Sequence, residues 1–254
     1  MKNIFVILKF AILSMLLVVV AALCSCAAEA ILYDEFRKET QQEEPADETP
    51  RITMTTDAHQ ITLFLSGNGT AEIDWGDRKE TVTLAVNLAG PAIVRTYSSA
   101  TERTITISGN NITGLSCNAN QITVLDISKY PALTELRCAE NSIEVLDLEN
   151  NTALGVLDCT ANQLTVLNVE KNIELKWLFC ADNQLTILNV VENNKALSWL
   201  DCQNNQLNAA QLNNLFTVLH NNMLDEEKLL LITGNIGAEA ANKSIAENKG
   251  WRVE

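Results

Sequence analysis

The chain has 254 residues, of which 47% are apolar, and a formal net charge of −14. This apolar content is typical of one or two folded units and excludes a wholly disordered protein. The negative charge argues against a nucleic-acid partner, because phosphate groups are bound by clustered lysine and arginine. Only His59 and His220 could act as histidine bases or metal ligands, and there is no Cys-x-x-Cys pair or glycine-rich phosphate loop. We therefore expect no cofactor and no bound metal.

The first 26 residues have the pattern of a secretion signal. Lys2 and Lys9 precede an apolar run over residues 11–23, which is short for a membrane-spanning helix. The run resembles the signal peptide of bacterial lipoproteins, which is removed up to a cysteine. An uncleaved membrane helix is the alternative. The resemblance implies a mature protein anchored by lipid in the cell envelope, on the outer membrane and exposed at the surface.

Two cysteines at the end of this run compete as the lipid acceptor. Cys24 follows the bulky Leu23, whereas Cys26 follows Ser25. Lipoprotein signals place a small residue before the acceptor, so the resemblance favours Cys26 as the lipidation site. Residues 27–50 are polar and acidic and contain two prolines. This composition predicts a disordered, solvated tether between the lipid and the folded part.

Residues 51–109 contain short runs of alternating apolar and polar residues. Turn residues separate the runs, which predicts a small antiparallel β-sandwich. The expected strands cover residues 60–65, 70–75, 80–84, 93–97 and 103–107.

One motif in this sandwich lies over residues 73–77, Ile-Asp-Trp-Gly-Asp, and is followed by Arg-Thr-Tyr at 95–97. Together they resemble the PKD-like, immunoglobulin-type modules common in bacterial surface proteins, although Arg78 and Arg95 stand where that family usually has Gly and often has His. Asp74 and Asp77 could be read as a calcium pair. Backbone hydrogen bonding in a hairpin turn explains the two carboxylates better, so we expect a turn.

A repeat of 21 residues, with one step of 22, begins near residue 110. The cysteines that recur at this step are Cys117, Cys138, Cys159, Cys180 and Cys202. Asparagines follow each of them three residues later, at Asn120, Asn141, Asn162, Asn183 and Asn205. Each unit reads roughly LxxLxCxxNxLxxLxL and resembles the leucine-rich repeat, with Cys in the sixth position where Leu is usual.

The physical pattern of the repeat agrees with this resemblance. Leu and Cys at alternate positions lie on one face of a short strand, and the second Leu-x-Leu predicts a second strand in each coil. Stacked coils bury a face that one coil cannot bury alone, which predicts a solenoid. The repeated Asn is expected to bond backbone groups in the turn. Residues 105–107 match the second-strand pattern, so we expect the sandwich to continue directly into the solenoid.

The rhythm changes after Asn205. Asn208 and Gln211 have the spacing of a capping box, and apolar residues follow at helical spacing. Residues 230–235 repeat the Leu-x-Cys-x-x-Asn spacing and predict a sixth rung. A helix near 239–247 and a strand at 251–253 are expected to cover the open end. We therefore divide the chain into a signal peptide (1–26), a tether (27–50), a PKD-like sandwich (51–109) and a leucine-rich-repeat solenoid (110–254) with a helical cap from about 208.

The cysteine column allows three interpretations, namely a metal column, disulfides or core filling. In-register side chains about 4.8 Å apart run parallel and do not face one another, which disfavours disulfides. A straight column cannot supply a tetrahedral zinc site. We therefore expect reduced, buried thiols that fill the core, and no cysteine nucleophile, since that would need an exposed thiol beside a base.

Positions three and five of each LxxLxC strand are expected to point outward onto a concave face. In rung order, the third positions are Gly114, Glu135, Val156, Trp177, Trp199 and Leu229. The fifth positions are Ser116, Arg137, Asp158, Phe179, Asp201 and Leu231. Outward aromatic side chains on neighbouring rungs are typical of recognition surfaces. The predicted ligand-binding residues are Trp177, Phe179, Trp199, Arg137, Asp158 and Asp201.

Two alternatives accompany this prediction. The C-terminal cap could instead fold over the face, above all over Leu229 and Leu231. A second outward column lies in the second strands and consists of Val124, Val145, Val166 and Ile187. We interpret it as a β-branched ladder that stabilises the stacking of the coils, in preference to a binding site.

The sequence therefore predicts a monomeric, lipid-anchored envelope protein without enzymatic activity. Its concave face is expected to bind a protein or glycan ligand, as in adhesion. The membrane contact is expected through the lipid on Cys26. A passive structural spacer is the first alternative, and an enzyme is a distant one.

Overall fold

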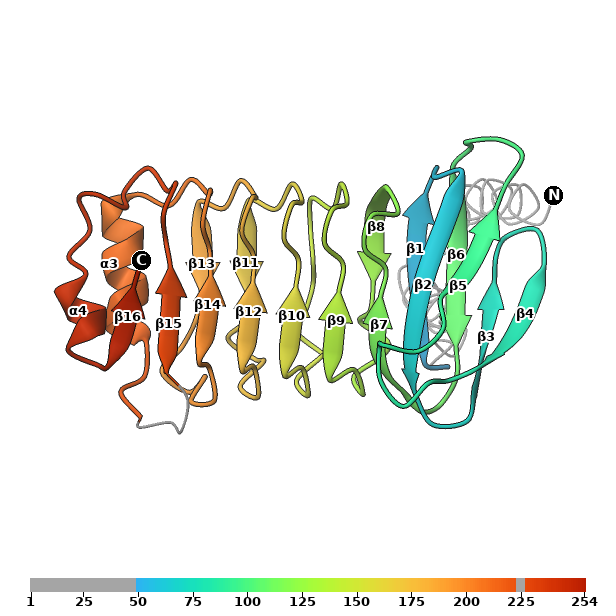
Figure 1. The fold of residues 1–254 in the computed structure, drawn as a ribbon, viewed down its shortest axis with the longest axis horizontal. Coiled ribbons are helices and arrows are strands. Elements are labelled where there is room, and N and C mark those ends of the chain that lie inside the picture. The colour runs from blue at the N-terminus through green and yellow to red at the C-terminus, as the bar shows by residue number, and fades with distance from the viewer. Residues whose placement is uncertain (1–48, 223–226) are drawn as a thin grey trace, which may run out of the picture. The chain divides into compact units, whose positions relative to one another are not determined.

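The computed structural model describes residues 49–222 and 227–254. The expected signal peptide, the lipidation site Cys26 and nearly all of the acidic tether lie outside the described residues. The described chain is mostly β, with a row of short strands that follow one another from β7 to β15 (Figure 1).

The first six strands match the alternating runs of the sequence. They are β1 (Arg51–Thr56), β2 (Gln60–Gly67), β3 (Thr70–Asp74), β4 (Lys79–Thr83), β5 (Ile93–Thr96) and β6 (Arg103–Ser108). Strand β1 was absent from the expected strands, although its alternate residues Ile52, Met54 and Thr56 are all buried. These strands divide between two sheets, one with the order β4-β3-β6-β1 and one in which β2 pairs with β5, and strands of the solenoid extend both sheets.

A parallel row of strands forms the solenoid, one from each coil. The row consists of β7 (Ile112–Ser116), β9 (Glu135–Arg137), β10 (Val156–Asp158), β12 (Trp177–Phe179), β14 (Trp199–Asp201) and β15 (Lys228–Leu231). Neighbours pair in the register that the repeat predicts, so that Leu136, Leu157, Leu178 and Leu200 share one row. In this β-solenoid β15 continues the row after the longer fifth coil, so the expected sixth rung is present.

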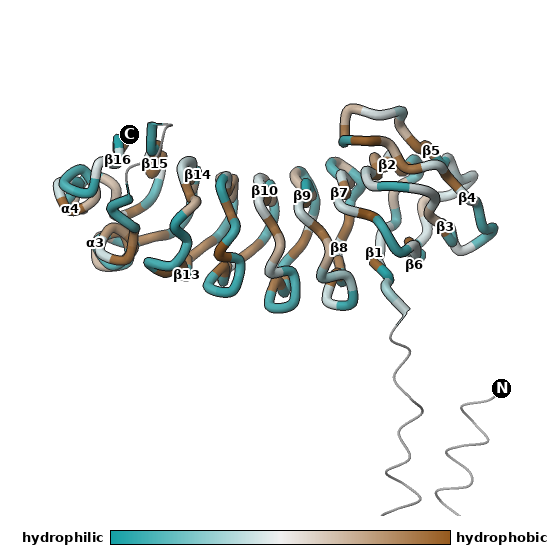
Figure 2. The backbone as a smooth tube through the Cα atoms, turned by 90° about the horizontal axis from the view of Figure 1, so that it is seen from below, coloured by the Kyte–Doolittle hydropathy of each residue, from teal (hydrophilic) through white to brown (hydrophobic). Residues whose placement is uncertain are grey.

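The second strand of each coil is less regular than the sequence predicts. β8 (Ile122–Asp126) is a full strand, whereas β11 (Val166–Asn168) and β13 (Ile187–Asn189) form a separate two-stranded sheet. The coil between β8 and β11 has no assigned second strand around Val145. Figure 2 shows the coils in side view, with apolar segments alternating with hydrophilic turns.

The junction between the N-terminal strands and the solenoid differs from the expected one. The second-strand pattern of β6 suggested a direct continuation into the first coil. Instead β1 lies between β6 and β8 and pairs antiparallel with both. Likewise β2 pairs antiparallel with β7. The consecutive strands β1 and β2 thus cover the two edges of the first coil, which would otherwise expose unpaired backbone groups.

The five repeat cysteines form a buried column with no exposed surface. All five are free thiols. Burial raises the pKa of the Cys117 and Cys202 thiols from 9.0 to about 12, because the thiolate would lose its hydration. The Cys180 thiol lies 3.3 Å from the backbone oxygen of Asp201 and donates to it. The column is therefore core filling, as expected.

The repeated asparagines form a hydrogen-bonded ladder beside this column. The Asn162 amide donates to the carbonyls of Cys138, Cys159 and Thr160 at 3.0, 3.1 and 3.2 Å. Its oxygen accepts from the Ile143 backbone N–H at 3.0 Å. Asn141, Asn183 and Asn205 bond in a closely similar way. Asn120 in the first coil instead exchanges hydrogen bonds with the Thr62 backbone of β2. Four of the five repeated asparagines thus bond backbone groups of the turn, as predicted, and also tie their turn to the preceding coil.

A second asparagine ladder was missed in the sequence. It consists of Asn151, Asn172 and Asn194, which are all buried. The Asn172 amide donates to the carbonyls of Leu148 and Asn151 at 3.1 and 2.8 Å. In the first coil Tyr130 takes this place, and its hydroxyl donates to Gly109 and accepts from the Ile112 N–H.

The chain ends in two helices and a strand. α3 (Ala209–Val218) begins at the N-cap Asn208, and the expected capping box with Gln211 is present. α4 (Ser244–Glu247) is shorter than the expected helix. β16 (Trp251–Val253) pairs in parallel with β15. None of the helices in the described ranges has the length and apolar character needed to cross a bilayer.

Candidate functional site

The outward positions of the solenoid's parallel strands form what we call the first-strand face, made by the third and fifth residues of each rung. Strand pairing aligns Val156, Trp177 and Trp199 in one column. Leu178 and Leu200, which lie between the outward residues of β12 and β14, are fully buried. Alternation along each strand therefore turns Trp177 and Trp199 outward, and they are 39% and 41% exposed.

These side chains line an open hollow of about 560 Å³. Its walls are Arg137, Val156, Asp158, Trp177, Phe179 and Trp199. Five of these residues are among the six that the sequence singled out, while the sixth, Asp201, is paired with Phe179 at the edge of the hollow. Val156, which the repeat placed in the same column, was not among the predicted residues. The structure thus brings the predicted residues together.

The aromatic side chains in the hollow are arranged at angles to one another. The Phe179 and Trp199 rings have centroids 5.6 Å apart and planes at 64°, an edge-to-face contact. Trp177 is the cross-strand neighbour of Trp199. A ligand can therefore contact ring surface on two adjacent rungs.

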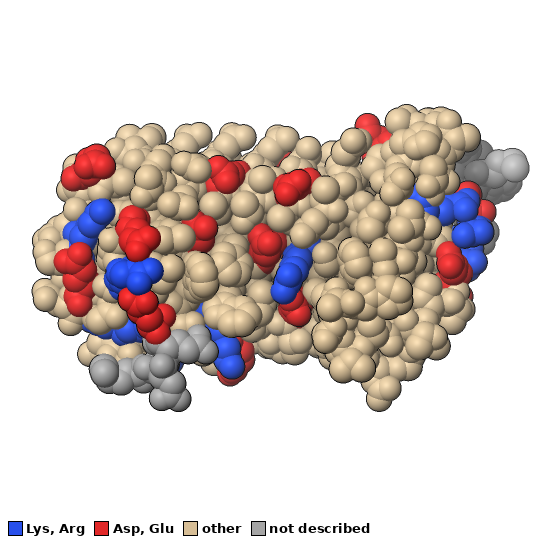
Figure 3. Space-filling view, viewed as in Figure 1, with Lys and Arg blue, Asp and Glu red and all other residues tan. Residues whose placement is uncertain are grey.

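The charged residues of the hollow are Arg137 and Asp158, with Asp201 at its edge. Arg137 is paired with its own strand neighbour Glu135 at 2.6 Å. Asp158 and Asp201 each accept one backbone hydrogen bond, from Thr160 and Gln203, at 3.1 Å. In Figure 3 the surface over the middle strands is largely uncharged, with separate acidic and basic groups.

Asp201 lies in an unfavourable environment for a carboxylate. Partial burial raises the pKa of its side chain above 3.8, and the negative charges of Asp182 and Asp158 add to this effect. The hydrogen bond from Gln203 acts in the opposite direction. The local field at this edge of the hollow is therefore negative.

The C-terminal segment does not remove Trp177 and Trp199 from solvent within the described residues. The sequence analysis named Leu229 and Leu231 as the residues that a cap could cover. Both are half-buried, and they pair with Trp199 and Asp201 of β14. The hollow therefore remains open on the middle rungs.

The second outward column has a different character. Val124, Val145, Val166 and Ile187 are all exposed. Val166 and Ile187 are direct cross-strand partners. Residues around Val124 and Val145 line a hollow that has no aromatic side chain. The β-branched ladder is present where its strands are formed, and it lacks the aromatic groups of the first-strand face.

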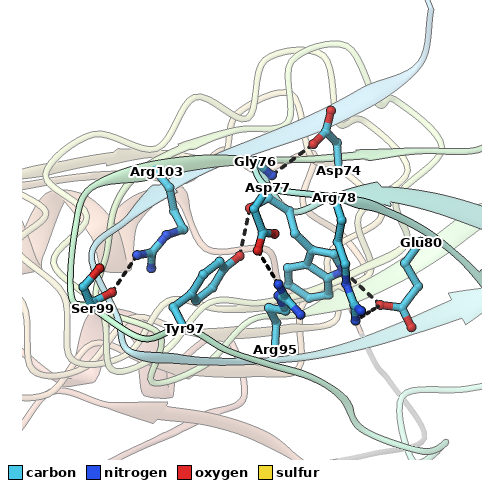
Figure 4. Close-up of polar contacts among 10 residues, drawn as sticks. Asp74, Gly76, Asp77, Arg78, Glu80, Arg95, Tyr97, Ser99 and Arg103 are labelled. Atoms are coloured by element: carbon cyan, nitrogen blue, oxygen red, sulfur yellow. Dashed lines mark hydrogen bonds and ion pairs between the residues drawn. The ribbon is translucent and has the colours of Figure 1, made fainter.

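The motif at residues 73–77 forms a hydrogen-bonded turn (Figure 4). Asp74 accepts a hydrogen bond from the Gly76 N–H at 3.0 Å, and Asp77 pairs with Arg95. The Tyr97 hydroxyl donates to the Trp75 carbonyl at 2.9 Å. Asp74 thus has the expected turn role, whereas Asp77 forms an ion pair with Arg95 that the turn interpretation did not include. Membership in the PKD-like class stays a prediction.

The buried histidine near the C-terminal end of α3 is held by backbone groups. His220 is buried, its Nε2 lies 2.7 Å from the Leu197 carbonyl oxygen, and its Nδ1 accepts from the Asn222 N–H at 3.2 Å. Both ring nitrogens are therefore engaged by backbone. Among residues 49–222 and 227–254, no group of three or more His, Cys, Asp and Glu residues is arranged to hold a metal ion.

No protein-family model and no curated protein matches this sequence. Among solved structures, similarity is found to the functional domain of InlJ from Listeria monocytogenes, described as including a cysteine ladder, with 30% identity and a TM-score of 0.41 over 53% of this chain and 28% of that one. An internalin, InlF, from the same organism has 29% identity and a TM-score of 0.39, over 46% of this chain and 33% of that one.

The leucine-rich-repeat protein LIC12759 from Leptospira interrogans has 22% identity and a TM-score of 0.36, over 50% of this chain and 38% of that one. This chain thus spans less than two thirds of the length of each of these three structures. The functional conclusion therefore has to come from the residues of this chain.

Proposed function

We propose that this chain is a binding protein of the bacterial cell envelope that recognises a partner macromolecule through the aromatic hollow of its first-strand face. The observation that carries the proposal is the pair of exposed tryptophans, Trp177 and Trp199, aligned on neighbouring rungs of a rigid sheet. Contiguous patches of exposed apolar side chains commonly mark the sites where a partner binds. Tryptophan is also enriched among the residues that dominate binding energy.

The rigidity of the support strengthens this proposal. Leu178 and Leu200 anchor the two strands in the core, and the thiols of Cys180 and Cys202 follow them inward. A ligand that stacks on the tryptophans therefore pays little to order the protein side of the interface. The hollow is open and shallow, which suits a segment of a polymer better than an enclosed small molecule.

The test uses Trp177→Ala and Trp199→Ala in the purified protein, with displayed peptides and arrayed glycans as probes. Each variant should weaken binding by about 2 kcal/mol or more, because truncation removes a ring from the centre of the interface. The melting temperature should change little, since neither tryptophan belongs to the buried core. Val145→Ala, on the second outward column, is the matched control and should leave binding unchanged.

Two other outcomes would redirect the interpretation. A large fall in melting temperature with unchanged affinity would identify the aromatic cluster as part of the fold. Equal binding by all variants, or none by any, would favour a passive structural spacer.

The same proposal places the protein on a membrane through a lipid on Cys26, with the acidic residues 27–50 as a tether. Cys26→Ala should therefore release the protein from the membrane fraction into the soluble fraction, because the acyl chains would be lost. Fractionation followed by immunodetection measures this. Cys24→Ala is the matched control and should stay membrane-bound; release by that change alone would assign the lipid to Cys24.

A further inference from the structure

The hollow can be narrowed to one class of ligand by the charges that surround its aromatic floor, an inference that rests on the proposed function. In the fifth-position column, strand pairing sets Phe179 between Asp158 on one side and Asp201 on the other. Adjacent strands lie about 4.8 Å apart, so each carboxylate-bearing residue is about one strand spacing from Phe179. An aromatic ring thus stands between two acidic residues.

These two carboxylates have no cationic partner in the described residues. Within residues 49–222 and 227–254, each accepts one hydrogen bond, from the backbone N–H of Thr160 and Gln203 respectively. Arg137, the nearest basic residue of the column, is engaged by Glu135 through both its Nε and its terminal nitrogen. The raised pKa of Asp201 reflects burial and nearby negative charge, and both would be offset by a bound cation.

The hydrogen-bonding groups of the hollow also discriminate between ligand classes. Asp158 and Asp201 are acceptors only, and Arg137 engages Glu135 through its Nε and one terminal nitrogen. A sugar hydroxyl can donate to the two carboxylates, but it carries no positive charge to offset theirs. Lysine and arginine present donors only, and their methylene stems pack on apolar surface.

We propose that the hollow binds a basic polypeptide segment, with a lysine or arginine side chain laid along Trp177 and Trp199 and its cationic end near Phe179, between Asp158 and Asp201. The rings attract the cation through their π faces. The carboxylates supply the countercharge at both sides. The net charge of −14 acts at longer range and favours the approach of a positively charged partner.

The experiment begins with selection of displayed random peptides on the wild-type protein and on the Trp177→Ala, Trp199→Ala double variant. Peptides that need the tryptophans should be enriched in Lys and Arg. One of them is then synthesised in matched forms that carry lysine, arginine, norleucine or glutamate at the anchor position. Norleucine keeps the methylene stem of lysine and lacks its charge, so it isolates the charge effect. A glycan array is screened in parallel.

The lysine and arginine peptides should bind at least about tenfold more tightly than the norleucine peptide, and the glutamate peptide more weakly still. Raising NaCl from about 0.05 M to about 0.5 M should weaken the lysine peptide severalfold and leave the norleucine peptide nearly unaffected. Asp158→Asn and Asp201→Asn remove the negative charge but keep a side-chain oxygen that can accept the backbone N–H hydrogen bond. Each should reduce the lysine preference at least about threefold, with an unchanged melting temperature.

Three results separate this inference from the proposed function. Tryptophan-dependent peptides without basic enrichment, or a norleucine peptide that binds as tightly as lysine, would overturn the cationic ligand and leave the binding face intact. Tryptophan-dependent binding to arrayed glycans in place of peptides would do the same and assign a sugar ligand. If neither peptides nor glycans bind in a way that depends on the tryptophans, both proposals are overturned.

Discussion

The inward and outward columns of the same strands differ in how strongly the residue type is constrained. Leu136, Leu157, Leu178 and Leu200 point inward from four consecutive rungs and are identical. The residues that precede them and point outward are Glu135, Val156, Trp177 and Trp199. Both columns belong to one parallel sheet with one register. The repetition therefore comes from packing between coils, and the variation occurs where packing makes no demand.

This difference separates residues that hold the fold from residues that are free to define a ligand. An inward position must fit the coil before and the coil after it, so only one size and polarity is suitable. An outward position meets only solvent and its lateral neighbours. Aromatic and acidic residues concentrated on three adjacent rungs are therefore not explained by stacking, which is why the hollow is the candidate site.

The largest test of the comparison places a charge in the inward column. Cys138→Asp should lower the free energy of unfolding by several kcal/mol, because a carboxylate would be buried among apolar groups without a partner. Urea unfolding followed by circular dichroism measures the loss. Val145→Asp is the matched control in the same coil, at a residue that is 76% exposed. It should change stability by no more than about 0.5 kcal/mol. Equal losses would show that the two columns do not differ in the way described.

A second test removes one step of the asparagine ladder. Asn162→Ala leaves the buried Ile143 N–H and the carbonyls of Cys138 and Cys159 without this side chain. An unsatisfied buried polar group costs about 1–3 kcal/mol, so we expect a loss of at least about 2 kcal/mol in the free energy of unfolding. The control is Asn150→Ala, which removes one exposed hydrogen bond to Ser128 and should cost far less. A similar loss in both variants would show that the buried hydrogen bonds of the asparagine ladder do not stabilise the fold more than an exposed one does.

The repeat made much of this architecture predictable. The cysteine column, the asparagine ladder, the capping box at Asn208 and the sixth rung all follow from spacing and side-chain chemistry, and the structure has them. The second ladder was also present in the spacing of Asn151, Asn172 and Asn194. It was missed because Tyr130 replaces asparagine in the first coil.

Other features depend on contacts that spacing does not encode. The local pattern of β6 fits a second strand, yet β1 occupies the place beside β8, because strand pairing is decided by long-range contacts. The outward columns located the aromatic hollow in the sequence. Its negative field could not be read there, since the raised pKa of Asp201 depends on burial and on the distance to Asp182 and Asp158.

The smallest test concerns a backbone feature that the inward column imposes on every coil. The residue before each repeated asparagine of the cysteine column, and before Asn235 on the sixth rung, has a positive φ. The value is 54° at Ala161 and 81° at Gly234. A left-handed conformation is unfavourable for alanine by about 1 kcal/mol or more, whereas glycine adopts it freely and loses part of this gain in the unfolded chain. Ala161→Gly should therefore raise the free energy of unfolding by about 0.5 kcal/mol.

Gly234→Ala should have the opposite sign at the equivalent position of the sixth rung. A Cβ there would lie 2.0 Å from the Asn204 Oδ1 atom, so Asn204 would have to move and give up its 2.8 Å hydrogen bond to Asp182. The loss should be about 1–2 kcal/mol, from the left-handed strain and the broken contact together. Thermal unfolding of the two variants measures both effects. If Ala161→Gly also destabilises the protein, the prediction for that position is wrong. Glycine would then be favoured at Gly234 only because Asn204 crowds it, and the positive φ at Ala161 would not be a source of strain.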